Sequence, residues 1–314
     1  MVYNVAIIGG GCAGLTAAIY CARARLDPIV FTDTYENKGG LLVKTSVVEN
    51  YPGFPEGING FDLISNMEQQ AVTYGANIVN NRIVQVDFSK RPFMLKDSQI
   101  NNYYVNSIII CTGSKPNLLG LDHEDRFWSN GISSCAVCDG ALYRNKKIMV
   151  VGGGDSAMEE ALFLTKFSDV VLVHRRNEFR ASKVMQERVI NNPKITIMYN
   201  TIIDQLNGNK LLKSVDLKNI ETDEITNLPI DGLFYGLGLT PNTKLFVDQI
   251  ELDRDGYIVR YRHPHGLYKT MTSVEGVFVA GDATDKKYKQ AVVACGDGCK
   301  AALDVEKYLE EHQK

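Results

Sequence analysis

Two stretches of the chain share the same order of hydrophobic and polar positions. In residues 4–33 an apolar run is followed by a glycine-rich turn, a segment with apolar positions at helical spacing and a second apolar run. Residues 147–176 repeat this order, again with glycines directly after the first apolar run. Short apolar runs of this kind are typical of buried strands, and the segment between them fits a crossover helix. The pattern therefore predicts two strand–helix–strand units.

The glycine spacing in both units matches the fingerprint of dinucleotide-binding folds. The first unit reads Gly-x-Gly-x-x-Gly from Gly9 to Gly14, and the second reads Gly-x-Gly-x-x-Ala from Gly152 to Ala157. Glycines at these places allow a tight turn and a close approach to a pyrophosphate, which the following helix N-terminus attracts. One match carries little weight, but two in the same context predict that the chain binds two dinucleotides. Two ordinary glycine-rich turns are the alternative.

The ends of the second strands distinguish the two expected ligands. The first unit reaches Asp33 about 20 residues after its glycines, where a carboxylate can bind the ribose hydroxyls of FAD or NAD. The second unit ends in His174, Arg175 and Arg176, with Arg180 a few residues further. Guanidinium groups bind phosphate oxygens through paired hydrogen bonds, so this cluster favours the 2′-phosphate of NADPH. A solvated basic helix start is the alternative.

Two further strand ends indicate how the units are arranged along the chain. The segments 106–117 and 276–291 each contain an apolar run that stops at Thr-Gly or Gly-Asp, where a backbone can meet a ligand closely. Because one segment precedes the second unit and the other follows it, we expect the second domain to be inserted into the first. The expected fold class is α/β with two Rossmann-like, three-layer domains. The first would comprise residues 1–115 plus 243–314, and the second residues 116–242.

The composition agrees with this organisation and disfavours some functions. With 314 residues and 45% hydrophobic content, the chain is long enough to form two cores. A net charge of −3 gives no reason to expect a nucleic-acid surface. The longest apolar runs have the length of strands and no targeting leader is visible, so we expect no membrane contact and a cytoplasmic location.

A C-x-x-C pair, Cys135 and Cys138, stands just before the second unit, with Asp139 next in sequence. Seven cysteines in a chain of this size do not suggest a secreted disulfide framework, so the pair is expected to be catalytic or metal-binding. In a redox pair one thiolate attacks a partner disulfide and the other resolves the mixed intermediate. Asp139 could then move the proton, or instead cap a helix. A zinc site completed by Cys295 and Cys299 is the alternative.

Taken together, the motifs resemble those of the low-molecular-weight thioredoxin reductases, NADPH-dependent and FAD-containing members of the pyridine nucleotide-disulfide oxidoreductases. The resemblance extends from Val5 to Leu309 and rests on the ordered segments CAVCDG, GGGDSAMEEALFLTK, HRRNEFRA, GLTPNT, VFVAGDATDKKYKQA and GCKAALDVEKYL. It implies a homodimer that passes electrons from NADPH through FAD and a cysteine dithiol to thioredoxin. It also implies that the inserted domain binds NADPH, carries the dithiol and rotates about the connections 114–117 and 240–242.

The fingerprints and the resemblance together assign residues to roles. The resemblance implies that Cys138 faces the flavin, that Cys135 attacks thioredoxin and that Asp139 is the acid–base group. The residues expected to bind FAD are Gly9, Gly10, Gly11, Cys12, Ala13, Gly14, Asp33, Gly40, Leu41, Asn50, Ile83, Gly113, Gly281, Asp282, Lys289, Gln290 and Ala291. The residues expected to bind NADPH are Gly152, Gly154, Asp155, Ser156, His174, Arg175, Arg176 and Arg180.

The chain departs from the family pattern at some of these positions. Cys12 stands where the family has proline, Leu41 where it has glutamine and Lys289 where it commonly has arginine. These differences concern the tuning of the flavin more than its binding.

No metal site is expected, and His263 and His265 are interpreted as loop residues. Two other functions stay open from the residues alone. One is a flavin reductase for a different dithiol protein, and the other is a zinc-stabilised nucleotide-binding regulator without turnover.

Overall fold

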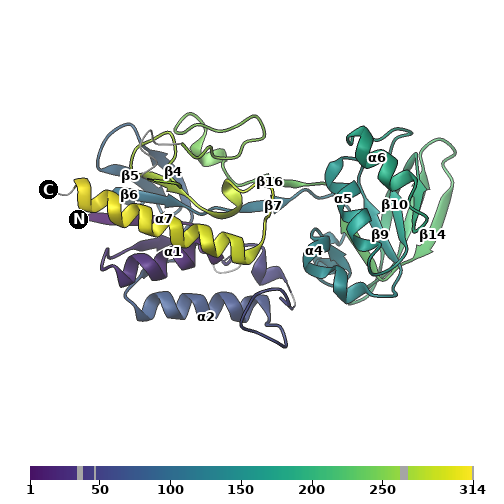
Figure 1. Cartoon of the computed structure of the whole chain (residues 1–314), viewed down its shortest axis with the longest axis horizontal. Helices are drawn as coiled ribbons and strands as arrows, with labels where there is room; N and C mark the ends of the chain where they lie inside the picture. Colours follow the sequence, from purple (N-terminus) through teal and green to yellow (C-terminus); the bar gives the residue numbers. More distant parts are fainter. Residues whose placement is uncertain (34–37, 46, 262–267, 313–314) are drawn as a thin grey trace. The chain divides into compact units, whose positions relative to one another are not determined.

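The computed structural model divides the chain into two compact units. Unit 1 comprises Met1–Lys115 and Thr240–Lys314, and unit 2 comprises Pro116–Leu239. Each strand–helix–strand segment lies in its own unit (Figure 1). The structure describes residues 1–33, 38–45, 47–261 and 268–312.

The framework of unit 1 is a sheet with the strand order β3-β2-β1-β6-β5-β4, in which β17 also pairs with β6. Its strands are β1 (Val2–Ile8), β2 (Ile29–Phe31), β3 (Asn77–Val79), β4 (Ile83–Asp87), β5 (Phe93–Asp97), β6 (Asn102–Ile110) and β17 (Val277–Val279). The strands β3, β2, β1, β6 and β17 run parallel, whereas β4 and β5 pair antiparallel. The carboxyl ends of β1 and β17 therefore lie at the same edge of the sheet as the first glycine turn.

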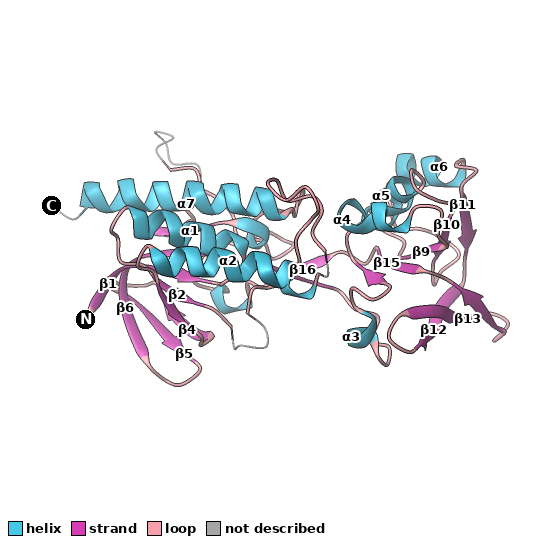
Figure 2. Ribbon diagram, turned by 90° about the horizontal axis from the view of Figure 1, so that it is seen from below, coloured by secondary structure: helices cyan, strands magenta, loops and turns pink. Residues whose placement is uncertain are grey.

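One face of this sheet is covered by α1 (Cys12–Arg23), α2 (Gly60–Thr73) and α7 (Ala291–His312) (Figure 2). The helices α1 and α7 approach closely because their facing residues are small. A Cβ atom placed on Gly298 would lie only 2.1 Å from the carbonyl oxygen of Ala13. Buried side chains from both helices and the sheet form one core, and aromatic and aliphatic side chains on the other face form a second.

Unit 2 has three layers around a parallel sheet of order β11-β10-β9-β15-β8. Most helices of unit 2 cover one side of this sheet, whereas a three-stranded antiparallel sheet and the short helix α3 (Glu124–Phe127) cover the other (Figure 2). The parallel strands are β8 (Ile132–Ser133), β9 (Ile148–Val151), β10 (Val170–Val173), β11 (Ile195–Met198) and β15 (Gly232–Tyr235). The antiparallel strands are β12 (Thr201–Gly208), β13 (Leu212–Asn219) and β14 (Ile225–Pro229), and the other helices are α4 (Ala136–Asp139), α5 (Asp155–Leu164) and α6 (Lys183–Ile190).

The chain passes between the units through β7 (Ser114–Pro116) and β16 (Leu239–Pro241), which pair with each other. The predicted fold class is confirmed, because two dinucleotide-type α/β units are present and the second interrupts the first. Among the helices of the described residues, none has the length and apolar character needed to cross a membrane.

Candidate active site and dinucleotide-binding turns

The C-x-x-C pair forms a closed disulfide between Cys135 and Cys138 in unit 2, with Cα atoms 5.3 Å apart. Cys135 caps the short helix α4, and its Sγ atom lies 3.2 Å from the backbone nitrogen of Cys138, which donates a hydrogen bond to it. Both cysteines are partly exposed. The structure thus holds the oxidised form of the pair, whereas the zinc alternative would need the same sulfurs as separate thiolates.

A serine connects the disulfide to the adjacent carboxylate. The hydroxyl of Ser133, at the end of β8, donates a hydrogen bond to Oδ2 of Asp139 over 2.6 Å. The hydroxyl oxygen of Ser133 in turn accepts a hydrogen bond from the backbone N–H of Cys135 over 3.0 Å. The carboxylate is therefore oriented by a group that also holds the first cysteine. Sequence reasoning missed Ser133, whose position two residues before a C-x-x-C was its only signal.

The glycine turn of unit 2 connects β9 to α5, and its glycines serve different purposes. A Cβ atom on Gly152 would lie 2.5 Å from the carbonyl oxygen of Gly236, and one on Gly153 would lie 2.1 Å from the ring of His174. These two positions need glycine for packing. By contrast, a Cβ atom on Gly154 would meet nothing within 4 Å, so the backbone there faces open space. That open side is where a pyrophosphate can approach the N-terminus of α5.

His174 lies beneath this turn. The residue is buried, and one ring nitrogen, Nε2, lies 2.9 Å from the carbonyl oxygen of Glu178. Burial lowers the pKa of His174 below its usual value, so the ring is neutral near pH 7. The structure places this ring as a support for the glycine backbone of the predicted NADPH site.

The basic segment after β10 is attached to the same turn. The backbone N–H of Arg180 donates to the carbonyl oxygen of Gly153 over 2.8 Å. The side chain of Asp155, in the first turn of α5, accepts hydrogen bonds from both the backbone N–H and the hydroxyl of Ser182 over 2.9 Å. Arg175 and Arg176, like Arg180, are exposed. Three exposed guanidiniums thus belong to a segment that is joined to the glycine turn through the backbone of Arg180.

Ser156 is exposed on the first turn of α5, as is Asp155. Ser182 was not predicted as a site residue, because the two hydrogen bonds that bring it to Asp155 span 27 positions in the sequence. The predicted NADPH residues come from the glycine turn, the start of α5 and the segment after β10, and Ser182 is joined to them through Asp155.

The glycine turn of unit 1 is built in the same way. Gly9 has a positive φ of 120°, and a Cβ atom there would lie 2.2 Å from the carbonyl oxygen of Cys111. A Cβ atom on Gly14 would lie 1.9 Å from the carbonyl oxygen of Gly9. Gly11 and Gly40 are open, since a Cβ atom would meet only a carbonyl oxygen at 3.8 Å in the first case and nothing within 4 Å in the second.

The N-terminus of α1 follows this turn. Gly11 provides no side-chain cap, and no acidic residue occupies the first turn of the helix. The backbone N–H groups that follow, from Cys12, Ala13 and Gly14, form a positive helix end suited to an anion. Gly10 contributes packing, because a Cβ atom there would lie 2.5 Å from the side chain of Thr32. The turn as a whole fits the pyrophosphate of FAD.

Two carboxylates predicted to bind FAD have different surroundings. Asp282, which follows Gly281 in a 3-10 turn, accepts a hydrogen bond from the hydroxyl of Ser114 over 3.2 Å. Its burial raises its pKa to about 6. Asp33 instead forms an ion pair with Arg82, whose Nε lies 3.2 Å from both of its oxygens. The sequence interpretation missed Arg82, and a ribose at Asp33 would share this carboxylate with the guanidinium.

The remaining residues predicted for FAD come from separate segments of unit 1. The side chains of Asn50 and Gln290 are brought together, with Nδ2 of Asn50 3.2 Å from Oε1 of Gln290. Ile83 starts β4 with its side chain buried in the core, so only its backbone could contact a ligand. Leu41 precedes a 3-10 turn, and Gly113 has a positive φ of 67° with open space at its Cβ position.

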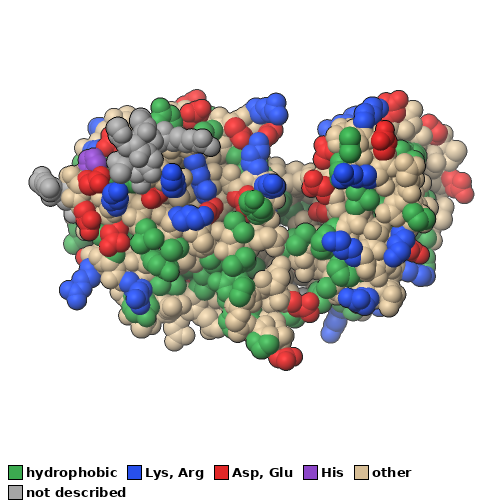
Figure 3. All heavy atoms as spheres, viewed as in Figure 1, with side chains coloured by type: hydrophobic (Ala, Val, Ile, Leu, Met, Phe, Trp, Pro, Cys, Tyr) green, Lys and Arg blue, Asp and Glu red, His purple; other side chains and the backbone are tan. Residues whose placement is uncertain are grey.

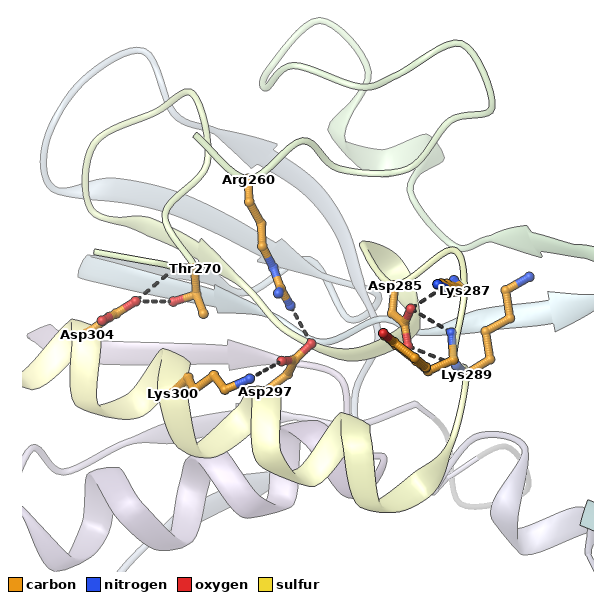
Figure 4. Close-up of polar contacts among 9 residues, drawn as sticks. Arg260, Thr270, Asp285, Lys287, Lys289, Asp297, Lys300 and Asp304 are labelled. Carbon is orange, nitrogen blue, oxygen red and sulfur yellow. Dashed lines mark hydrogen bonds and ion pairs between the residues drawn. The ribbon is translucent and has the colours of Figure 1, made fainter. Parts of the chain in front are cut away.

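The loop before α7 is shaped by Asp285. Its carboxylate accepts hydrogen bonds from the backbone N–H groups of Lys287, Tyr288 and Lys289 (Figure 4). These bonds position Lys289, Gln290 and Ala291, where α7 begins.

Further along α7, the nearly buried carboxylate of Asp297 pairs with Arg260 and with Lys300 (Figure 4). The Lys300 Nζ atom lies 3.2 Å from Oδ1 of Asp297. This network, which sequence reasoning missed, fixes α7 to the segment that precedes β17.

Among the residues that the structure describes, no group of three or more His, Cys, Asp or Glu side chains is placed to hold a metal ion. His263 and His265 lie outside the described residues.

The fold and the site together define a class of enzyme. Two dinucleotide-type units, one of which carries a cysteine disulfide, are the parts of a pyridine nucleotide-disulphide oxidoreductase. The profile of that family matches residues 3–298.

Individual relatives narrow the class further. The thioredoxin reductase of Chlamydia pneumoniae is 48% identical over 309 residues, which cover 96% of this chain and 97% of the relative. That of Rickettsia typhi is 47% identical over 312 residues, 98% of each. Among solved structures, the thioredoxin reductase from Giardia duodenalis has a TM-score of 0.91 at 39% identity, covering 99% of this chain and 100% of that one. The one from Streptococcus pyogenes has a TM-score of 0.92 at 34% identity, covering 99% of both.

The chain therefore belongs to the thioredoxin reductases within the pyridine nucleotide-disulphide oxidoreductase family, as the resemblance in its sequence predicted.

Proposed function

We propose that this chain reduces the disulfide of oxidised thioredoxin with electrons from NADPH, which pass through FAD and the Cys135–Cys138 pair. The observation that carries the proposal is the disulfide itself, closed between Cys135 and Cys138 in the same compact unit as the second dinucleotide turn. NADPH and the disulfide would then be carried on the same unit. We further propose that unit 2 turns about β7 and β16, so that NADPH and the disulfide reach FAD one after the other.

In this proposal NADPH is bound at the open side of the turn around Gly154. The N-terminus of α5 would hold its pyrophosphate, with Ser156 in the first turn of the helix. The three exposed guanidiniums after β10 would hold the 2′-phosphate, since planar forks bind phosphate oxygens bidentately. These interactions would favour NADPH over NADH, because the latter carries only a hydroxyl at this position.

FAD would be bound by unit 1, with its pyrophosphate at the turn Gly9–Gly14 and its ribityl side near Asp282. Bound FAD converts the hydride of NADPH into the two electrons that open a disulfide. The residues of the chain supply the rest: open glycines allow the approach, the N-terminus of α1 neutralises the pyrophosphate and Asp282 accepts hydroxyl hydrogen bonds.

Once reduced, the pair can act on a protein disulfide. The backbone N–H of Cys138 points at Sγ of Cys135 and would stabilise a thiolate there, which favours Cys135 as the attacking sulfur. That thiolate attacks one sulfur of the thioredoxin disulfide and releases the other as a thiolate. Cys138 then attacks Cys135, which closes the internal disulfide and frees the second thioredoxin thiol. Asp139, held by Ser133, would transfer the protons that these steps require.

We also propose that the enzyme is a homodimer in the cytoplasm, a compartment in which thiols are kept reduced. Large apolar side chains stay exposed on the helices of unit 1, among them Tyr20, Phe61, Val72, Val292 and Leu303. Hydrophobic side chains gather on this part of the surface, and acidic and basic side chains lie around them (Figure 3). An apolar helical face of this kind is typical of a subunit interface.

The experiment that tests the proposal measures NADPH oxidation by the purified, yellow protein in the presence of oxidised thioredoxin. We expect turnover with NADPH, weak turnover with NADH and none in Cys135→Ser, although NADPH should still bleach the flavin of that variant. Reduction of the flavin without any turnover of thioredoxin, while another dithiol protein is reduced, would instead support the alternative flavin reductase. A colourless protein that carries zinc would overturn both.

A further inference from the structure

A second pair of cysteines lies in unit 1, away from the proposed catalytic disulfide in the sequence. Cys12 is the first residue of α1, directly after the glycine turn, and Cys295 lies in the second turn of α7. Sγ of Cys295 lies 3.7 Å from the carbonyl oxygen of Cys12. The two thiols are also close enough for each to shift the pKa of the other. Both are free cysteines in this structure.

The backbones of the two helices bring these thiols together. One turn beyond Cys295, Gly298 packs so closely on α1 that a Cβ atom would lie 2.1 Å from the carbonyl oxygen of Ala13. Ala294 also belongs to this contact, because it lies in the same core as Ala13. Small residues at the crossing therefore let the first turn of α1 approach the part of α7 that carries Cys295.

The surroundings make the two thiols unequal. The hydroxyl of Tyr51 donates to Sγ of Cys295 over 3.4 Å. The hydrogen bond from Cys12 and further ones from Thr16 and Tyr51 lower the pKa of Cys295, despite its burial. The hydrogen bond to Cys295, together with burial, raises the pKa of Cys12. A thiol with a lowered pKa beside one with a raised pKa is the arrangement of an attacking and a resolving cysteine.

We propose that Cys12 and Cys295 form a second redox pair, which hydrogen peroxide converts into a disulfide that joins the first turn of α1 to α7. The Cys295 thiolate attacks one oxygen of the peroxide, which breaks the O–O bond, releases hydroxide and leaves a sulfenic acid. The sulfur of Cys12 then attacks the sulfenic sulfur. The S–S bond forms as the hydroxyl group and the Cys12 proton depart as water, so the peroxide takes up two electrons in total.

This function goes beyond disulfide reduction and does not depend on it. The new disulfide would lock the helix end that follows the first glycine turn, and a dithiol reductant would release it again. Because Cys12 stands next to Gly11, the cross-link would act on the backbone proposed to bind the FAD pyrophosphate.

The test counts thiols in the holoenzyme without NADPH, so that the catalytic disulfide stays closed. Seven cysteines less the two in that disulfide leave five thiols that a reagent can label after denaturation. After brief treatment with dilute hydrogen peroxide we expect three, with a peptide that links Cys12 to Cys295 in a non-reducing digest. Dithiothreitol should restore the two lost thiols, and the oxidised protein should unfold at a higher temperature than the untreated one.

Single variants separate this pair from ordinary thiol oxidation. In Cys12→Ser the sulfenic acid of Cys295 should persist and react with dimedone, whereas Cys295→Ser should lose no thiol. The matched control Cys299→Ser, one turn further along α7, should still lose two. Five thiols that survive peroxide, a cross-link to a different cysteine, or equal losses in Cys295→Ser would each overturn the proposal.

Discussion

The hydroxyl oxygen of Ser133 lies 2.6 Å from Oδ2 of Asp139 and accepts a hydrogen bond from the backbone of Cys135. One side chain thus connects both ends of the short segment that carries the disulfide. The proton that accompanies each thiol step would pass through a carboxylate whose orientation depends on this serine.

Ser133→Ala should slow turnover of thioredoxin about tenfold, because the loss of one hydrogen bond to a charged group costs about 1.5 kcal/mol. The step affected should be proton transfer, so the pH–rate profile should shift while the KM for NADPH stays unchanged. Stopped-flow measurement of the flavin and steady-state kinetics across pH check both points. Ser133→Thr, which keeps the hydroxyl, is the control and should recover most of the activity. An unchanged pH profile in Ser133→Ala would contradict the positioning role.

The arginines after β10 should determine the choice of nucleotide. Replacing Arg175 and Arg176 by Gln should raise the KM for NADPH about tenfold or more for each phosphate-binding guanidinium, because charged hydrogen bonds contribute about 1.5–3 kcal/mol. The KM for NADH should hardly change. Arg188→Gln, exposed in the last turn of α6, is the matched control and should leave both values as they are. If both nucleotides were affected equally, the segment would not recognise the 2′-phosphate.

The crossing of α1 and α7 should tolerate no side chain at Gly298. Gly298→Ala is expected to lower the free energy of unfolding by about 1–3 kcal/mol, because its Cβ atom would collide with the backbone of α1. Gly296→Ala offers a control on the same helix, since its Cβ atom would meet nothing within 4 Å. That variant should be neutral or more stable by about 0.5–1 kcal/mol, because alanine is the better helix former. Denaturant unfolding of both proteins measures the difference, and equal stabilities would contradict the close contact.

Asp97 should make the protein more stable at neutral than at acidic pH. The carboxylate is buried, and although burial raises its pKa, hydrogen bonds from Asn101, Asn81 and Gln99 lower it to about 2 overall. A folded-state pKa below the unfolded one adds stability above about pH 4, and this contribution is lost as the pH falls towards 2.

Asp97→Asn should therefore lower the unfolding midpoint at pH 7 and lose part of this deficit as the pH falls from about 4 to 2. Thermal unfolding across this range measures both proteins. Asp62→Asn, which removes an exposed carboxylate on α2, is the control for the loss of one negative charge. A constant difference between Asp97→Asn and the parent would mean that the hydrogen bonds do not favour the ionised form.

The sequence was sufficient to predict the repeated strand–turn–helix plan, because glycine spacing and apolar runs are local signals. It also predicted which segments carry the dithiol and the arginines. It did not reveal that Asp33 pairs with Arg82, since 49 positions separate the two and nothing local marks a guanidinium as its partner. The sequence shows that a carboxylate stands at the expected strand end, but it does not show that Arg82 would share this carboxylate with a ribose.

The same limit applies to the contacts of α7. That Gly298 rests on Ala13, and that Cys295 meets Cys12, depends on how two helices far apart in the chain cross. Small residues in a helix are compatible with many packing partners, so the periodicity of the sequence does not predict which helix α7 packs against. The packing of His174 was also beyond the sequence, because nothing local shows that its ring lies against Gly153 of the glycine turn. Its role in binding NADPH stays a prediction.

The insertion of unit 2 reverses the usual order of events during synthesis. Domains commonly fold one after another as the nascent chain leaves the ribosome, beginning with the first one made. Here β17 and α7, which complete the sheet and the helical layer of unit 1, are translated only after all of unit 2. Unit 2 is continuous in the chain and can close its core first. Until α7 has been made, the apolar side of α1 has no helix to pack against. We therefore expect the first segment of unit 1 to become native only after unit 2 has folded, and until then its apolar surface would be open to a chaperone.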